Sequence, residues 1–127
     1  FQGALAIDPD YKDAKENIFV TYRDAGKYFG DQRGDLAKSL QFLGEAYKMK
    51  PDDFETIRLL GIANGVGGNM AAAEQYFNKA LEINAEHADT WFDLGITYLS
   101  MGNQARHNEC IAKAQQLDPG IMARRKK

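Results

Sequence analysis

The chain has one cysteine, no long apolar run and almost no net charge, and these shortages limit the kinds of protein that it can be. A single cysteine cannot form an internal disulfide, so no oxidising compartment is implied, and both the cytoplasm and the periplasm stay open. No apolar run approaches the roughly 18 residues that a membrane-spanning helix needs. A formal net charge of −2 lacks the basic excess typical of a nucleic-acid-binding domain.

The chain does have enough apolar residues for one buried core, with 127 residues of which 44% are hydrophobic. Phe1-Gln2-Gly3 matches the end of a protease-cleavable purification tag, and we set it aside from fold reasoning. Residues 4–9 read as the ending of a helix seen again at residues 80–84. We therefore expect the chain to begin within a structural repeat.

An internal repeat organises the rest of the sequence. Leu60-Gly61 returns as Leu94-Gly95, which is 34 positions later (95 − 61), and Gly68-Asn69 returns as Gly102-Asn103. In the later copy Trp91, Leu94, Gly95 and Tyr98 are spaced for one face of a helix, with a glycine where a second helix can pack closely.

This 34-residue period, with the pattern W-x2-L-G-x2-Y followed by a small residue and a proline, resembles the tetratricopeptide repeat family. The resemblance implies an all-α fold, a right-handed superhelical stack of antiparallel helix hairpins. It also implies a general function, the binding of other proteins, and no enzymatic activity or cofactor.

The apolar spacing divides the chain into helices that fit this architecture. It predicts a helix over residues 11–28, a turn at residues 30–34, and a second helix from Leu36 that ends before Pro51. We expect repeats at about residues 11–51, 53–85 and 87–119, followed by a basic tail at 120–127. The first repeat is eight residues longer than the period, which resembles Sel1-like relatives of the family, and we expect the extra length as added helical turns and a longer loop at residues 27–34.

In arrays of this family the first helix of each repeat lines a concave groove that holds a partner peptide. Carried onto this sequence, the predicted groove is formed by repeats two and three, and repeat one offers Lys12, Glu16, Val20 and Arg23 less clearly because of its insertion. The predicted groove residues are Glu55, Arg58, Ile62, Val66, Asp89, Phe92, Asp93, Ile96 and Leu99.

The charge of this groove separates it from chaperone-binding members of the family, which hold a peptide's terminal carboxylate with lysines, an arginine and asparagines. The matching positions here are Glu16, Val20, Leu59, Asp89 and Asp93. Acidic groups would repel a carboxylate. The groove is therefore expected to take an apolar or basic segment, although Asp89 and Asp93 are equally compatible with a plain solvated face.

Two motifs have a functional reading and a structural one. The glycine-rich residues 65–69 lack the spacing of a phosphate-binding loop, so we expect an interhelical turn. His107 and Cys110 are three positions apart on a predicted helix, but two ligands without a third do not make a metal site, so we expect a partly buried histidine and a small apolar cysteine. Asp52-Asp53 and Glu86-His87 with Asp89 stand at predicted helix starts, where capping explains them.

The sequence after Pro119 offers little cover for the last repeat. We expect at best one short basic turn there, and a solvated tail for Arg124–Lys127.

Together these features predict a scaffold or adaptor that binds a protein or peptide, with no nucleic acid and no membrane span. Phe92, Ile96 and Leu99 would be apolar anchors, and the charged groove residues would supply selectivity. The alternative is a structural module that forms homo-oligomers through the open ends of its repeats.

Overall fold

The computed structural model describes residues 9–31 and 34–125. The predictions for the tag remnant at residues 1–3 and for most of the partial repeat at residues 4–9 therefore lie outside the described residues. The chain divides into two compact units, Phe1–Pro51 and Asp52–Lys127, and each is described by itself.

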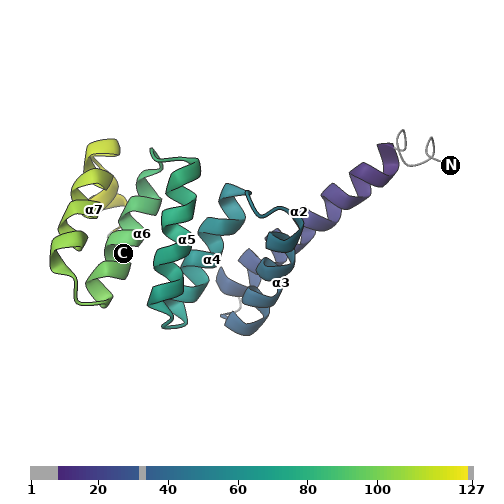
Figure 1. Cartoon of the computed structure of the whole chain (residues 1–127), viewed down its shortest axis with the longest axis horizontal. Coiled ribbons are helices and arrows are strands. Elements are labelled where there is room, and N and C mark those ends of the chain that lie inside the picture. Colours follow the sequence, from purple (N-terminus) through teal and green to yellow (C-terminus); the bar gives the residue numbers. More distant parts are fainter. Residues whose placement is uncertain (1–8, 32–33, 126–127) are drawn as a thin grey trace. The chain divides into compact units, whose positions relative to one another are not determined.

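All regular structure in the described ranges is helical (Figure 1). Unit 1 contains two helices, α2 (Pro9–Asp31) and α3 (Leu36–Met49). Unit 2 contains five helices: α4 (Phe54–Val66), α5 (Met70–Ile83), α6 (Ala88–Ser100), α7 (Gln104–Leu117) and α8 (Ile121–Arg124). The predicted second and third repeats correspond to the helix pairs α4 with α5 and α6 with α7.

Unit 1 is one helix hairpin with an unusually long first helix. Helix α2 has 23 residues, whereas α4 and α6 have 13 each, so the predicted extra helical turns are confirmed. The predicted turn begins too early, because Gly30 and Asp31 continue the helix. The two helices approach closely at Gly26, whose carbonyl oxygen accepts a 2.7 Å hydrogen bond from the hydroxyl of Ser39. Phe19 and Leu43 are buried in this unit.

In unit 2 the 34-residue period extends to the residues that begin each helix. Helices α4 and α6 are capped by Asp53 and His87, and α5 and α7 are capped by Asn69 and Asn103. Each of the four side chains accepts a hydrogen bond from a backbone N–H three residues further on, which satisfies a donor that the helix leaves open. The capping role predicted for Asp53 and His87 is confirmed.

The glycine-rich segment is a turn, as predicted. Helix α4 ends at Val66, Gly67 caps it, and Gly68 adopts φ of +87° before α5 begins. Gly102 has φ of +81° at the matching position between α6 and α7. Glycine is suited to this left-handed conformation because it has no Cβ.

The core of unit 2 lies where α5, α6 and α7 meet. A buried cluster joins large residues of α5 and α6 to small residues of α5 and α7. Its members are Ala73, Phe77, Leu81, Leu94, Tyr98 and Cys110. Ile62 and Trp91 are partly buried and pack against this cluster. Gly61 and Gly95 lie directly against the partner helix of their own hairpin, as the spacing predicts.

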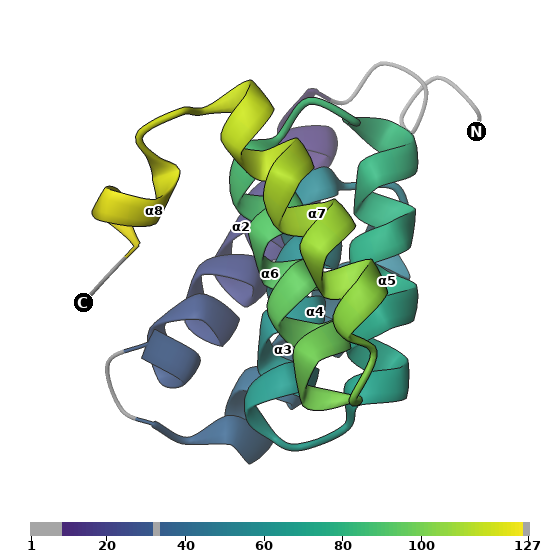
Figure 2. The same ribbon diagram turned by 90° about the vertical axis from the view of Figure 1, so that its left-hand side faces the viewer.

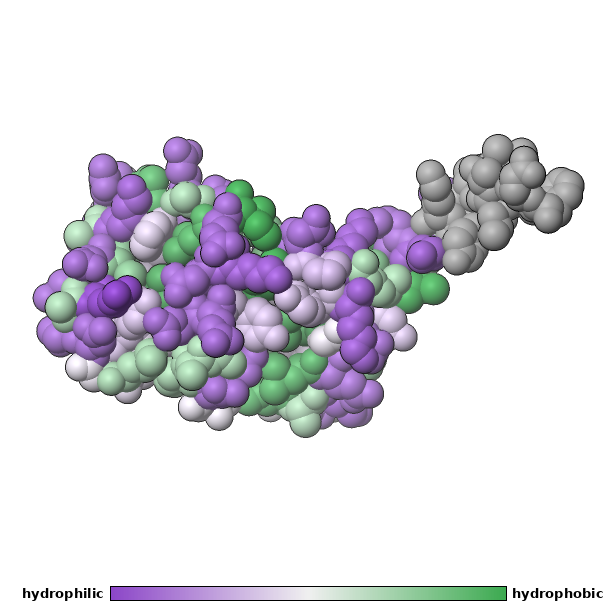
Figure 3. Space-filling view, viewed as in Figure 1, coloured by the Kyte–Doolittle hydropathy of each residue, from purple (hydrophilic) through white to green (hydrophobic). Residues whose placement is uncertain are grey.

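Helix α8 returns from the end of α7. Figure 2 shows it on the α6 side of α7, away from α5. On the face of unit 2 seen in Figure 3, hydrophilic residues predominate and apolar residues form smaller groups between them.

Candidate functional site

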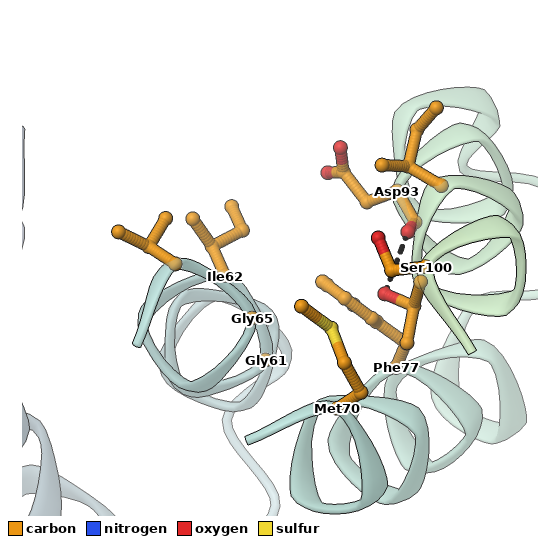
Figure 4. Close-up of a pocket in the computed structure, with 10 residues that line it drawn as sticks. Gly61, Ile62, Gly65, Met70, Phe77, Asp93 and Ser100 are labelled. Carbon is orange, nitrogen blue, oxygen red and sulfur yellow. Dashed lines mark hydrogen bonds between the residues drawn. The ribbon is translucent and has the colours of Figure 1, made fainter. Parts of the chain in front are cut away.

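A groove of about 240 Å³ opens between α4 and α6. Ile62 lies on the α4 wall and Asp93 on the α6 wall, while Met70 and Phe77 of α5 rise between them (Figure 4). Its lining is mostly apolar and comes from all three helices: Gly61, Ile62, Gly65, Val66, Met70, Phe77, Asp93, Ile96, Thr97 and Ser100.

Four of the nine predicted groove residues line this groove. They are Ile62, Val66, Asp93 and Ile96. Val66 and Ile96 are 74% and 42% exposed, so they present apolar surface to solvent. Leu99 is also exposed, but it is not part of the lining. The predicted residues that line this groove thus come from both of its walls, α4 and α6.

Two other predicted residues neutralise each other near the start of α4. Arg58 donates from Nη2 to Glu55 Oε1 and Oε2 at 3.1 and 2.9 Å, and from Nε to Oε1 at 3.2 Å. The Arg58 side chain is largely covered. Because this pair is one turn apart on one helix, its charges largely cancel, and neither residue lines the groove.

The last two predicted residues, Asp89 and Phe92, lie together with Asp93 around two arginines. These are Arg124, the last residue of α8, and Arg125, which follows it. Arg125 donates from Nη1 to Asp89 Oδ1 at 2.8 Å and from Nη2 to Asp93 Oδ1 at 2.6 Å. Its guanidinium carbon lies 4.5 Å from the centre of the Phe92 ring. Arg124 donates to Asp89 Oδ1 at 3.1 Å and to Asp118 Oδ2 at 2.6 Å. We call Asp89, Phe92, Asp93 and Arg125 the arginine cluster.

The two aspartates of this cluster differ in their electrostatics. Burial raises the pKa of the Asp93 carboxyl, and the hydrogen bond and charge of Arg125 offset only part of that rise. Burial acts in the same direction on Asp89, but the hydrogen bonds from Arg125 and Arg124 outweigh it, so the pKa of Asp89 is lowered. Asp93 is thus the carboxylate that most depends on a neighbouring cation.

The prediction of a solvated tail is wrong for Arg124 and Arg125, which are ion-paired, while Lys126 and Lys127 lie outside the described residues. The single short basic turn predicted after Pro119 is present as α8. Ile121 of α8 is completely buried, so even a four-residue helix provides an apolar contact at this end of unit 2. Sequence reasoning missed the ion pairs with Asp89 and Asp93 because these two partners lie more than 30 positions upstream.

Sequence reasoning also missed the floor of the groove. Phe77 is buried in the core of unit 2, yet its ring also reaches the groove lining because Gly61 beside it has no side chain. Met70 begins α5 and has no distinctive pattern in the sequence. A residue of the second helix of a repeat reaches the groove only where the first helix has no side chain in the way. Gly61 and Gly65 of α4 were the sequence signal for such a place.

The predicted residues of unit 1 lie near a separate surface. Glu16 accepts a 2.5 Å hydrogen bond from Lys50 Nζ, which also lies 4.8 Å from the centre of the Phe19 ring. Arg23 lies 3.7 Å from Asp24, and its guanidinium carbon is 5.4 Å from the centre of the Phe19 ring. Val20 is half-buried, and the side chain of Lys12 is outside the described set.

His107 and Cys110 have the structural roles that we expected. His107 Nδ1 lies 2.9 Å from the carbonyl oxygen of Gly95, where it donates a hydrogen bond. Cys110 is buried, and burial raises the pKa of its thiol to about 11. Within residues 9–31 and 34–125, no three His, Cys, Asp or Glu side chains converge as metal ligands would. No helix in that same part of the chain has the length and apolar character to cross a membrane.

Comparisons with known proteins agree on the architecture. A tetratricopeptide repeat family profile matches residues 76–116. The photosystem I assembly protein Ycf3 of Rippkaea orientalis is 28% identical over 116 residues, which are 89% of this chain and 65% of that protein. The chain spans between 5% and 65% of the length of the curated relatives that it matches.

Solved structures extend this agreement over nearly the whole chain. The crystal structure of MamA superposes with a TM-score of 0.80 at 26% identity and covers 97% of this chain and 71% of that one. The first TPR domain of Spaghetti (RPAP3), bound to the HSP90 peptide SRMEEVD, has a TM-score of 0.75 at 15% identity, with 81% of each chain covered. At 15% identity, the RPAP3 domain shows a similar fold and nothing more.

Proposed function

The chain belongs to the tetratricopeptide repeat family, and from that premise we propose that it is a scaffold or adaptor whose groove between α4 and α6 binds a peptide or a partner protein. The observation that carries the proposal is the groove itself. It is lined by α4, α5 and α6, and it leaves Val66 and Ile96 in contact with solvent. Apolar side chains of a partner gain free energy by displacing water from such a surface.

The charges around the groove select among partners. Asp93 lies on its wall and Asp89 lies one turn earlier on α6. Both are paired with Arg125 in the free protein, so they attract a basic segment that can take the place of that arginine, and they repel an acidic one. The preferred partner is therefore an apolar segment that carries a basic residue. The RPAP3 domain, whose fold is similar, was solved with the peptide SRMEEVD, and that acidic sequence is the natural negative control here.

Selection from a random peptide library tests this proposal. The wild-type protein should enrich peptides with an apolar residue next to a basic one, and it should not bind SRMEEVD. The double variant Ile62→Ser with Ile96→Ser should lose the enriched peptides. Ile83→Ser is the matched control, because Ile83 is 46% exposed and does not line the groove. Equal binding by the groove variant and the control would refute the proposal.

A second candidate is self-assembly through exposed surface of the first repeat. Ile18 and Tyr28 of α2 are both 48% exposed, which is a large apolar exposure for one helix. The buried Ile121 weakens the corresponding argument at the other end of the array. Multi-angle light scattering over a wide concentration range decides the question. A mass that rises with concentration in the wild type and not in Ile18→Ser supports assembly, and a constant monomer mass refutes it.

A further inference from the structure

The groove continues into a site that already holds an arginine side chain. We propose that Asp89, Phe92 and Asp93 form a receptor for an arginine of the partner segment, and that Arg125 of the chain itself occupies this receptor until the partner displaces it. This inference rests on the proposed function, since it names the residue by which the partner is recognised.

The geometry is specific for a guanidinium group. One planar group donates to two carboxylates, at 2.8 Å to Asp89 and 2.6 Å to Asp93, while its carbon stands 4.5 Å from the centre of the Phe92 ring. A guanidinium has several donors in a fixed fork and stacks on an aromatic face. A lysine ammonium is a compact charge that cannot span both carboxylates and the ring in this way. The receptor should therefore favour arginine over lysine.

The carboxylates require a cation from some source. The Asp93 side chain is only 14% exposed, and Asp89 lies beside it on the same helix face. A buried carboxylate without a partner is strongly unfavourable. Arg58 contributes only a distant charge to Asp93, because its guanidinium is engaged by Glu55. The cation must then be Arg125 or a group that replaces it.

Asp93 also connects the receptor to the apolar groove, since it lines the groove and accepts from Arg125. Asp89, Phe92, Asp93 and Ile96 occupy positions i, i+3, i+4 and i+7 of α6, which place them along one helix face. A partner that lays an apolar side chain against Ile96 thereby brings a neighbouring arginine to Phe92. The two recognition elements form one continuous surface along α6.

Arg125 can leave without removing α8. Ile121 is completely buried and holds the start of this helix, and Arg124 retains Asp118 as a local partner at 2.6 Å. The receptor is thus filled by a side chain just beyond a separately anchored turn. While Arg125 fills the receptor, the partner cannot bind there. The partner's apparent affinity is therefore its intrinsic affinity multiplied by the fraction of molecules in which the receptor is free.

The test uses two short probes, the amidated peptides acetyl-Ala-Arg-Arg-Ala and acetyl-Ala-Lys-Lys-Ala, titrated while the backbone amide resonances of Phe92 and Asp93 are followed by NMR. Arg125→Ala should bind the arginine probe at least tenfold more tightly than the wild type does. The lysine probe should bind that variant at least fivefold more weakly than the arginine probe. Adding Asp93→Asn should abolish the gain.

Two controls keep the test decisive. Arg124→Ala leaves Arg125 in place, so it should bind the arginine probe as weakly as the wild type. Arg125→Lys keeps the charge at this position and provides a folded comparison if Arg125→Ala proves unstable; it should still gain affinity, because lysine is the weaker occupant. Equal binding of the two probes, or no gain in both position-125 variants, would overturn the inference.

Failure of this inference can be separated from failure of the proposed function. If Asp93→Asn enriches library peptides with the same apolar residues and the same arginine content as the wild type, the receptor is wrong and the groove stands. If Ile62→Ser with Ile96→Ser changes nothing in the selection, the groove itself is wrong.

Discussion

Replacement of Gly61 by alanine tests how closely α4 and α5 are packed beneath the groove. A Cβ atom at this position would lie 2.7, 2.8 and 3.0 Å from three carbon atoms of the Phe77 ring. Carbon atoms are at their optimal separation at about 3.5–4.0 Å, so the ring or the helix must move by roughly 1 Å. Phe77 is 2% exposed and belongs to the buried cluster of unit 2, which resists such a shift.

Two effects oppose each other in this variant. Alanine is favoured over glycine inside a helix by about 1 kcal/mol, while overpacking of a core costs about 1–3 kcal/mol. The difference is a net loss of about 0–2 kcal/mol, and we expect its middle value, about 1 kcal/mol, in the free energy of unfolding. Gly65→Ala is the matched control on the same helix, because its Cβ would lie 3.7 Å from the Cβ of Ala73, an ordinary contact. That variant should be neutral or more stable by up to about 1 kcal/mol.

Urea unfolding followed by circular dichroism at 222 nm measures both variants. With a slope of about 1–3 kcal/mol/M, a loss of about 1 kcal/mol lowers the midpoint for Gly61→Ala by roughly 0.3–1 M relative to the wild type. The groove is the open side toward which the Phe77 ring can move, so peptide affinity should fall as well. If Gly61→Ala is stabilised as much as Gly65→Ala, the close approach of these two helices is refuted.

Three further predictions concern single positions. Asp53→Ala should cost about 1 kcal/mol in unfolding free energy, since it removes the cap of α4; an unchanged urea midpoint would contradict the capping role. Ile121→Ala should cost about 2 kcal/mol or more, measured in the same way, because it leaves a cavity under α8; no loss would show that this end is not packed. Native Cys110 should react with iodoacetamide at pH 8 about 100-fold more slowly than an ordinary thiol, because the pKa of its thiol is raised from 9.0 to about 11. The same shift makes the contribution of the protonated thiol to stability complete below pH 9, and that contribution is lost as the pH rises through about 11. Rapid labelling of the folded protein would refute its burial.

Much of the architecture follows from patterns that are local in the sequence. The 34-residue period gave the two hairpins of unit 2 with helix ends close to those observed, because caps such as Asp53 and Asn69 and the turn glycine Gly68 act within a few residues. The end of α2 was harder to predict. Gly30 and Asp31 are turn-forming residues by composition, yet the helix continues through them. Packing against α3 overrides propensity there, since a Cβ on Gly30 would lie 3.0 Å from the hydroxyl of Ser39.

The site was only partly predictable, for a reason of distance along the chain. The family resemblance put Ile62, Val66, Asp93 and Ile96 on one surface, and all four line the groove. It could not supply Arg125, which lies 32 positions from Asp93 and reaches it only because α8 turns back. Long-range charge pairs of this kind have no periodic signal, so they require the structure.

The most direct test of the central claim is to locate the bound peptide on the protein. The strongest peptide from the library selection would be titrated into isotope-labelled protein, and changes in the backbone amide resonances would be mapped by residue. The account predicts that the largest changes lie along the facing walls of the groove, at Ile62, Val66, Asp93 and Ile96, with Ile83 unaffected. Changes centred on Ile83 and the outer faces of α5 and α7, with the groove residues unmoved, would contradict it.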